Sequence, residues 1–166
     1  MATASTNTTG IPAGGSPLYT KAERARRDAS VWTLVQGIMA PLQFAVFLVS
    51  VALVLRYLVT GAGYEVATLS IIVKTAVLLL MMVTGAIWEK VVFGQYLFAP
   101  AFFWEDLFSF AVIGLHLLYV FVLLDGRAEP RSMMYLALFA YAAYVINAGQ
   151  FVWKLRRARL DAAAGS

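Results

Sequence analysis

One stretch of the chain, Trp88–Asp106, combines acidic and aromatic side chains in a way that could do acid–base chemistry. Its three carboxylates are Glu89, Glu105 and Asp106, and they stand among two tryptophans and four phenylalanines. An ordinary loop between helices is instead rich in Gly, Ser, Asn and Asp. A carboxyl group packed against aromatic rings is poorly solvated and can keep its proton near neutral pH, as a general acid must. We therefore expect this stretch to cover a functional site at the membrane surface.

The elements that must position this site are apolar helices. The chain is 61% hydrophobic, well above the usual share of a soluble domain. Four apolar runs are each long enough to cross a bilayer as a helix, at about 20 residues per span; they cover residues 32–58, 66–88, 102–124 and 133–153. The sequence therefore predicts an all-α, polytopic membrane protein, a bundle of four transmembrane helices.

The two ends of the chain differ from this apolar middle. Residues 1–18 consist largely of Thr, Ser, Asn, Gly, Ala and Pro, a composition that predicts a disordered N-terminal tail. Residues 19–159 then form one transmembrane domain, and residues 160–166 a C-terminal tail. Asp28 and Ser30 are candidate N-caps of the first helix. Pro41 lies inside the first apolar run, where we expect it to kink the helix.

The basic residues predict the orientation. Four spans put both termini and the Trp88–Asp106 stretch on one side of the membrane. That side carries nine of the 13 basic residues: Lys21, Arg24, Arg26, Arg27, Lys90, Lys154, Arg156, Arg157 and Arg159. The other side carries three, which are Arg56, Arg127 and Arg131. The richer side is expected to be cytoplasmic, and no basic face remains for binding nucleic acid.

Two ionisable residues fall within the spans, where such groups are costly and ask for a reason. Lys74 and His116 each lie eight residues from the outer end of a helix, or about 12 Å deep. They can share one layer if their helices face each other. His116 could equally be a neutral histidine that hydrogen bonds to a carbonyl group. Snorkelling would strain the reach of Lys74, so we expect it to have an internal partner.

A second polar layer is expected at the cytoplasmic side. Glu105 and His116 are eleven residues apart, which places them on nearly the same helix face, about 16 Å apart along the axis. Such a face suits a large, flat, amphipathic ligand. Each residue of this layer also has a structural interpretation. Glu89 and Lys90 could form a solvated pair, and Glu105 and Asp106 could be acids stabilised by the helix N-terminus.

Several other polar and aromatic residues have similar alternatives. Trp88 and Trp104 could be interfacial anchors, while Asn147 and Gln43 could join helices by hydrogen bonds. The absence of cysteine excludes disulfides and thiolate chemistry, and a single histidine excludes a multi-histidine metal site within one chain. No phosphate-binding glycine loop or Ser-His-Asp set is present.

The chain resembles a known family, the 3-vinyl bacteriochlorophyllide hydratases, from about residue 19 to residue 159. The long motif that runs from Trp88-Glu89-Lys90 through Tyr96–Asp106 makes a chance match improbable. The residues that carry the resemblance are Ala40–Phe44, Val73–Thr75, Met82–Lys90, Phe93-Gly94, Tyr96–Asp106, His116, Ala143–Ala148 and Gln150-Phe151.

The resemblance implies a hydro-lyase of bacteriochlorophyll synthesis. Water would add across the 3-vinyl group of a bacteriochlorophyllide or chlorophyllide to give a 3-(1-hydroxyethyl) group. This addition needs no redox cofactor, and the substrate carries its own magnesium, for which His116 is a candidate axial ligand. From their chemistry we assign Glu105, Asp106 and Glu89 as catalytic. The residues assigned to substrate binding are His116, Lys74, Lys90, Trp88, Trp104, Asn147 and Gln43.

The expected surroundings follow from the same resemblance. The protein would lie in the bacterial inner (intracytoplasmic) membrane, with the lipid bilayer, a second copy of itself or neighbouring pigment-biosynthesis enzymes as partners. Two alternatives remain open. One is a non-enzymatic pigment-binding subunit that uses His116 as a magnesium ligand. The other is a small transporter with Lys74 and the acids as a proton relay, although the chain lacks the internal repeats typical of transporters.

Overall fold

The computed structural model describes residues 18–164, and within this range all regular structure is helical. The helices are α1 (Lys21–Ala29), α2 (Val31–Thr60), α3 (Tyr64–Phe93), α4 (Phe103–Asp125) and α5 (Pro130–Ala164). Four of them, α2 to α5, are long and apolar enough to cross a membrane. The prediction of an all-α bundle of four membrane-spanning helices is therefore confirmed.

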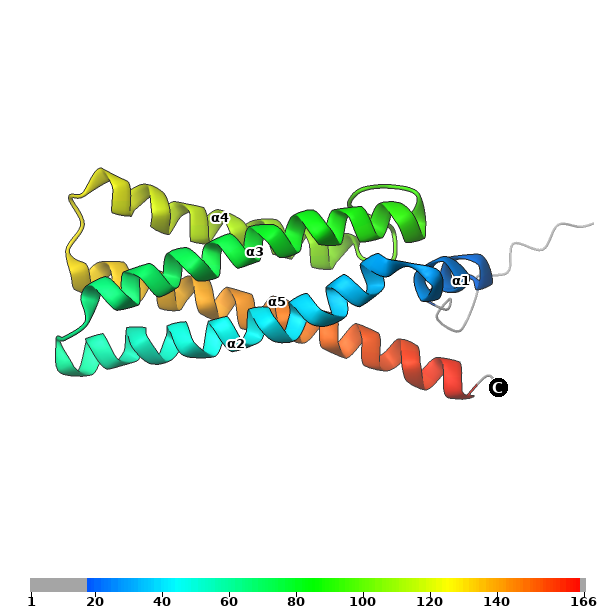
Figure 1. Cartoon of the computed structure of the whole chain (residues 1–166), viewed down its shortest axis with the longest axis horizontal. Helices are drawn as coiled ribbons and strands as arrows, with labels where there is room; N and C mark the ends of the chain where they lie inside the picture. Colours follow the sequence, from blue (N-terminus) through cyan, green and yellow to red (C-terminus); the bar gives the residue numbers. More distant parts are fainter. Residues whose placement is uncertain (1–17, 165–166) are drawn as a thin grey trace, which may run out of the picture.

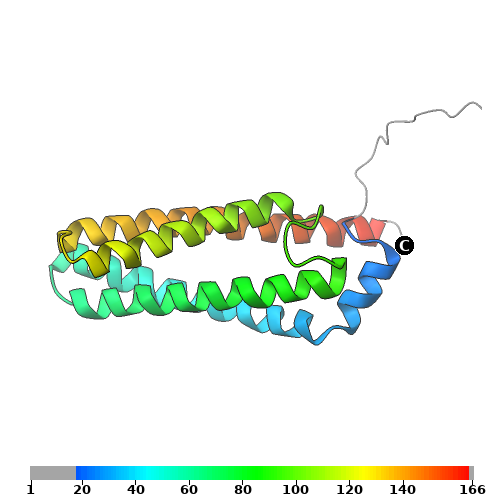
Figure 2. The same cartoon turned by 90° about the horizontal axis from the view of Figure 1, so that it is seen from above.

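The long helices lie side by side as two hairpins (Figure 1). One hairpin pairs α2 with α3 and the other pairs α4 with α5, and Figure 2 shows them as two layers. The α2–α3 turn is tight because Gly61 adopts a left-handed conformation, φ 71°, and its N–H donates to the Tyr57 carbonyl. Only glycine takes that conformation without a steric cost.

The start of the first long helix tests the two predicted N-caps. Ser30 caps α2, since its hydroxyl accepts a hydrogen bond from the Trp32 N–H at 3.2 Å. The prediction for Asp28 was wrong, because Asp28 lies in the last turn of α1 and pairs with Arg27. The sequence does contain the signal for this short extra helix: Thr20 and Glu23 form a capping box. The Thr20 N–H that donates to Glu23 lowers the pKa of that carboxyl.

The bounds of the long helices are wider than the apolar runs. The helix α2 continues through Pro41 as one unbroken element. The helix α5 extends beyond the last apolar run to Ala164, because Lys, Leu and Arg are good helix formers and continue the pattern. The predictions for the outermost tails, at residues 1–17 and 165–166, lie outside the described residues.

The core of the bundle lies where the two hairpins meet. Phe47 from α2, Ile71 from α3 and Tyr141 from α5 are all buried in it. Large apolar side chains also cover the outside, for example Val59, Phe121 and Leu124, which are 70% or more exposed. An exposed apolar surface of this kind is stable in lipid but not in water, so the packing agrees with a membrane environment.

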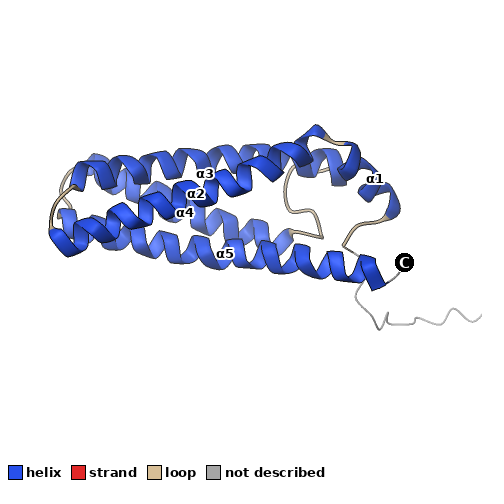
Figure 3. Ribbon diagram, turned by 60° about the horizontal axis from the view of Figure 1, so that its bottom comes forward, coloured by secondary structure: helices blue, strands red, loops and turns tan. Residues whose placement is uncertain are grey.

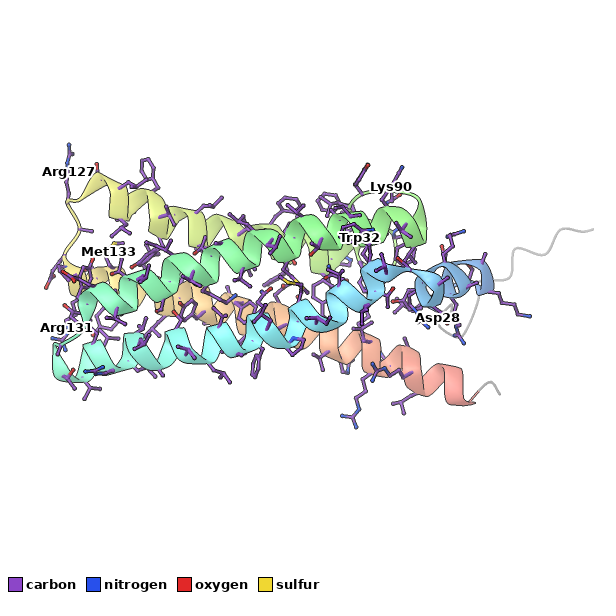
Figure 4. All side chains as sticks on the ribbon, in the orientation of Figure 1. Asp28, Trp32, Lys90, Arg127, Arg131 and Met133 are labelled. Carbon is purple, nitrogen blue, oxygen red and sulfur yellow. The ribbon has the colours of Figure 1, made fainter. Side chains whose placement is uncertain are left out.

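The two ends of the bundle differ in character. Arg127 and Arg131 mark one end, whereas Asp28 and Lys90 mark the other (Figure 4). The second end, here called the loop end, also carries α1 and the long connection between α3 and α4 (Figure 3). The helix α1 is fastened there by Arg26, whose Nε donates to the Val92 carbonyl at 2.8 Å. Tyr19 stacks on Phe93 at a centroid distance of 5.7 Å.

Candidate active site

Two carboxyl groups from different hairpins meet at the loop end. Glu89 lies in the last turns of α3, and Asp106 lies in the first turn of α4. Gly94 ends α3 in a left-handed conformation, φ 88°, so that the chain turns back towards α4. Both acids are buried, with exposed fractions of 5% for Glu89 and 4% for Asp106. Their meeting depends on how the connection between α3 and α4 folds.

The two carboxyl groups lie within hydrogen-bonding reach of each other. A hydrogen bond between them needs one O–H donor, so the pair is suited to hold one proton between two acids. Backbone N–H groups of the connecting loop satisfy the remaining oxygens: Phe98 donates to Asp106 Oδ2 at 2.7 Å and Ala99 donates to Glu89 Oε2 at 3.2 Å. The loop therefore fixes both acids while leaving them a proton to exchange.

The loop that holds these acids contains a strained residue. Phe98 has φ 58°, the only positive φ of a non-glycine residue in the described range. Its ring stacks on Phe110 at 5.5 Å and contacts Phe103 at 5.6 Å, both on α4. A bulky residue in this conformation is uncommon and costs free energy, so it persists only where its surroundings enforce it. Here the enforced conformation aims the Phe98 N–H at Asp106.

Glu105 has a partner on α5. Neighbouring helix residues point about 100° apart, and Glu105 turns towards α5, where its Oε2 lies 2.5 Å from Lys154 Nζ. Asn147 donates to the Glu105 backbone carbonyl at 3.1 Å. The structure thus joins Asp106 to Glu89 and Glu105 to Lys154, rather than Glu105 to Asp106. We call these four side chains the carboxyl layer.

Lys154 is a site residue that the sequence reasoning missed. It was counted only as part of the basic C-terminal cluster. A signal was present, since Asn147, Gln150 and Lys154 recur at intervals of three and four residues and so share one face of α5. That face meets the start of α4. A basic residue that continues a polar stripe is therefore a candidate partner for a buried acid.

The predicted aromatic and basic residues of the loop end are divided between inside and outside. Trp88 is half-buried; its Nε1 donates to Thr33 Oγ1 at 2.9 Å, and its ring packs on Phe102. Trp104 is 69% exposed and faces outwards. Lys90 is also exposed, and its Nζ donates to the Gly94 carbonyl at 2.8 Å. The structure therefore brings neither Trp104 nor Lys90 to the carboxyl pair.

A second polar group, the deep layer, lies inside the bundle and consists of Lys74, His116 and Gln43. Lys74 and His116 are fully buried, and Gln43 is 5% exposed. Lys74 Nζ lies 3.7 Å from the centroid of the Tyr144 ring. His116 Nδ1 lies 2.8 Å from the Val112 carbonyl, and its ring lies 5.8 Å from that of Tyr141. Tyr141 and Tyr144 are one turn apart on α5, so Lys74 and His116 do share a layer.

Comparison with known proteins identifies the family. Residues 19–157 match the family model described as 2-vinyl bacteriochlorophyllide hydratase. The chain belongs to this family. A 2-vinyl bacteriochlorophyllide hydratase of Rhodobacter capsulatus is 67% identical over 147 residues, which cover 89% of this chain and 85% of the relative. One from Cereibacter sphaeroides is 67% identical over 144 residues, covering 87% and 89%.

These findings confirm the resemblance seen in the sequence. The relatives' names number the vinyl-bearing position 2 where our expectation used 3, and both describe hydration of the vinyl group of a bacteriochlorophyllide. No solved structure matches the chain. Among the described residues there is no group of three or more His, Asp and Glu side chains that could hold a metal ion.

Proposed function

We propose that the Glu89–Asp106 pair transfers the proton in the hydration reaction of this family. The chain is a hydratase, a hydro-lyase of bacteriochlorophyll biosynthesis, as the family match and the 67% identical relatives show. The single observation that supports the residue assignment is the pair of buried, adjacent carboxyl groups that the loop N–H groups hold. We take the substrate to be a bacteriochlorophyllide or chlorophyllide whose vinyl group becomes a 1-hydroxyethyl group.

The first chemical step is protonation of the vinyl group. The shared proton moves from the pair to the terminal CH₂ carbon, which becomes a methyl group as the π electrons form the new C–H bond. The inner carbon is left as a cation that is delocalised into the macrocycle. Both carboxyls are then ionised and lie close to this cation, which they stabilise electrostatically. The N–H groups of Phe98 and Ala99 hold the two anions in place.

The second step returns the proton. A water molecule attacks the cationic carbon through its oxygen, and the carboxylate pair accepts the proton that the water releases. The product carries one added H and one added OH, and the pair again holds one proton. The cycle therefore closes without a second acid, and it consumes no electrons. We accordingly propose that no cofactor is needed beyond the magnesium that the substrate carries.

Glu105 and Lys154 have a supporting role in this scheme. Lys154 forms an ion pair with Glu105, which engages that carboxylate with α5 and not with the Glu89–Asp106 pair. The ion pair also ties the start of α4 to α5 and thereby fixes the helix turn that carries Asp106. When both members of the carboxyl pair are ionised, the nearby Lys154 charge opposes their repulsion.

The four apolar helices make this a multi-pass membrane protein. We propose that its loop end faces the cytoplasm and that the membrane is the bacterial inner membrane, because the loop end carries most of the basic residues. The chain lacks cysteine, so single cysteines report topology directly. A Gly126→Cys variant in intact cells should react with an impermeant maleimide from the periplasmic side. Labelling of that variant only from the cytoplasmic side would overturn the orientation.

The hydration itself is tested with isotopes. Purified protein in detergent, with no nucleotide, flavin or metal added, is incubated with vinyl bacteriochlorophyllide in ¹⁸O-labelled water or in D₂O. We expect one ¹⁸O in the new alcohol and one non-exchangeable deuterium in the new methyl group, measured by mass spectrometry. Tight pigment binding without any labelled product would instead support the non-enzymatic pigment-binding alternative.

A further inference from the structure

The deep layer holds polar atoms that no described residue satisfies. Lys74 Nζ, His116 Nε2 and Gln43 Oε1 are all buried without a hydrogen-bond partner among residues 18–160. A buried polar atom that stays unpaired costs on the order of 1–3 kcal/mol, so such atoms are rare and ask for an explanation. Three such atoms lie at one level of this membrane bundle, so we treat the deep layer as a candidate binding site.

Lys74 is the costliest of the three to leave unpaired, because its amino group can carry a full charge. Its side chain is fully buried, so it does not snorkel to the membrane surface. The acidic residues of α3 and α4 lie near the ends of those helices, away from Lys74 in the middle of α3. The Tyr144 ring under Nζ offers a cation–π contact, which attracts an ammonium group but accepts none of its hydrogen bonds in the usual sense. Lys74 therefore lacks an anionic partner among the side chains that the structure describes.

His116 restricts what that partner can be. The Val112 carbonyl oxygen can only accept, so Nδ1 carries the hydrogen and Nε2 carries the lone pair. Within the layer, Nε2 is an acceptor and the amino group of Lys74 is the donor. A ligand that presents an anionic oxygen would pair with Lys74 and supply its missing counter-charge. Lys74 is thus suited to a carboxylate, whereas His116 Nε2 and Gln43 Oε1 can only accept and need a hydrogen-bond donor instead.

The distance between the two layers suggests which part of the substrate reaches this point. Asp106 and His116 are ten residues apart on α4, about 15 Å along the axis. Lys74 and Glu89 are fifteen residues apart on α3, about 22 Å. The long Lys74 side chain shortens this distance, because its Nζ lies at Tyr144 of α5, ten residues or about 15 Å from Lys154 of the carboxyl layer. This length is comparable with the full width of a tetrapyrrole that carries a carboxylate side chain. It is longer than the distance from the vinyl group to the central magnesium. The spacing therefore favours an anchor for a side chain at the periphery of the macrocycle over axial ligation of magnesium by His116.

We propose that Lys74 binds the free carboxylate of bacteriochlorophyllide while the vinyl group lies at the Glu89–Asp106 pair. This inference rests on the proposed function, because the carboxyl pair defines where the vinyl group lies. The contact between Lys74 and the carboxylate would make the enzyme prefer the free acid as its substrate. An ester of the same pigment has no anion for Lys74 and would leave the amino group buried and unpaired.

The test compares bacteriochlorophyllide with its methyl ester, which keeps the macrocycle and the vinyl group but removes the charge. Dissociation constants are measured by absorbance titration and turnover by product formation. The native protein should bind the acid about 10- to 100-fold more tightly than the ester, the range for a hydrogen bond to a charged group. Lys74→Met should lose this preference by weaker binding of the acid, while its affinity for the ester stays close to that of the native protein.

Matched variants separate this role from a structural one. Thr75→Val removes a neighbouring buried hydroxyl that donates only to Ile71 of its own helix, and it should keep the preference for the acid. Lys74→Arg retains a positive charge and should keep most of the preference. Glu89→Gln should bind the acid preferentially but fail to hydrate it, so failure of the anchor and failure of the proposed function give different results.

Two results would overturn the anchor. One is a native protein that binds acid and ester equally, a comparison that needs no variant. The other is a folded Lys74→Met protein that still prefers the acid as strongly as the native protein does. Folding is checked by circular dichroism and gel filtration. We expect Lys74→Met to fold, because it replaces an unpaired buried amino group by an apolar side chain.

Discussion

The carboxyl layer and the deep layer are both buried and polar, but they differ in how their groups are satisfied. In the carboxyl layer Glu89 pairs with Asp106, Glu105 pairs with Lys154, and loop N–H groups complete the set. In the deep layer, Lys74 Nζ and His116 Nε2 have no partner among the described residues. The polar groups of the carboxyl layer find their partners within the protein, whereas those of the deep layer need a partner from a bound molecule.

This difference separates two tasks. A group that gives up and regains a proton in each cycle must hold its geometry in both states, and a complete hydrogen-bond set provides that. A group that recognises a ligand must instead present an unmet donor or acceptor, because the ligand's own groups complete it. We therefore assign chemistry to the carboxyl layer and recognition to the deep layer.

The largest expected effect comes from breaking the proton-transfer pair. Glu89→Gln and Asp106→Asn should each lower turnover by about 10²- to 10⁴-fold, the usual loss for a general acid or base. The amides keep the shape of the side chains but no longer share a titrating proton. Pigment binding, measured by absorbance titration, should change little. Steady-state rates with vinyl bacteriochlorophyllide check the prediction.

The comparison variant for this pair is Glu105→Gln. It removes the third carboxylate of the same loop end, yet leaves the Glu89–Asp106 pair in place. We expect it to slow turnover far less than the other two changes. If Glu105→Gln proved the most damaging of the three, the proton would come from Glu105, as the sequence alone had also allowed.

The next effect is on stability and concerns the Glu105–Lys154 ion pair. Its side chains are 11% and 26% exposed, between a surface pair and a fully buried one. Removing either partner should lower the free energy of unfolding by about 1–3 kcal/mol. The double variant Glu105→Gln/Lys154→Gln should lose clearly less than the sum, since neither charge is then left alone. Reversible unfolding in detergent measures the coupling; strictly additive losses would show that the two groups do not interact.

Much of the architecture could be predicted from the sequence because it depends on local pattern. Apolar runs gave the four spans to within a few residues, except where α5 continues through a polar segment to Ala164. Glycines and a proline marked the turns. The motif around Trp88–Asp106 located the candidate site and the family. Counting positions along the helices also placed Lys74 and His116 in one layer.

The pairing of side chains could not be predicted in the same way. Glu105 and Asp106 are neighbours in sequence, but on a helix they point to different faces. Asp106 meets Glu89 only because the connecting loop folds back over the helix ends. Lys154 reaches Glu105 from the far end of the chain. Such contacts depend on packing between hairpins, which local sequence does not specify.

The smallest effect concerns the strained loop residue that holds the carboxyl pair. At an ordinary position, glycine is less stable than alanine by about 0.5–1 kcal/mol, because glycine has more freedom to lose on folding. Phe98 has φ 58°, where an L-residue with a side chain pays about 1–2 kcal/mol and glycine pays nothing. The order should therefore reverse, with Phe98→Gly more stable than Phe98→Ala by up to about 1 kcal/mol.

Both Phe98 variants lose the ring contacts with Phe110 and Phe103, so their difference reports the backbone alone. Gln95, in the same loop with an ordinary φ, supplies the control: Gln95→Gly should be less stable than Gln95→Ala. Thermal unfolding in detergent ranks the four proteins. If Phe98→Ala were the more stable of its pair, the left-handed conformation would carry no strain in solution. The Phe98 N–H would then reach Asp106 through an unstrained loop, and the loop would not enforce the geometry of the carboxyl pair.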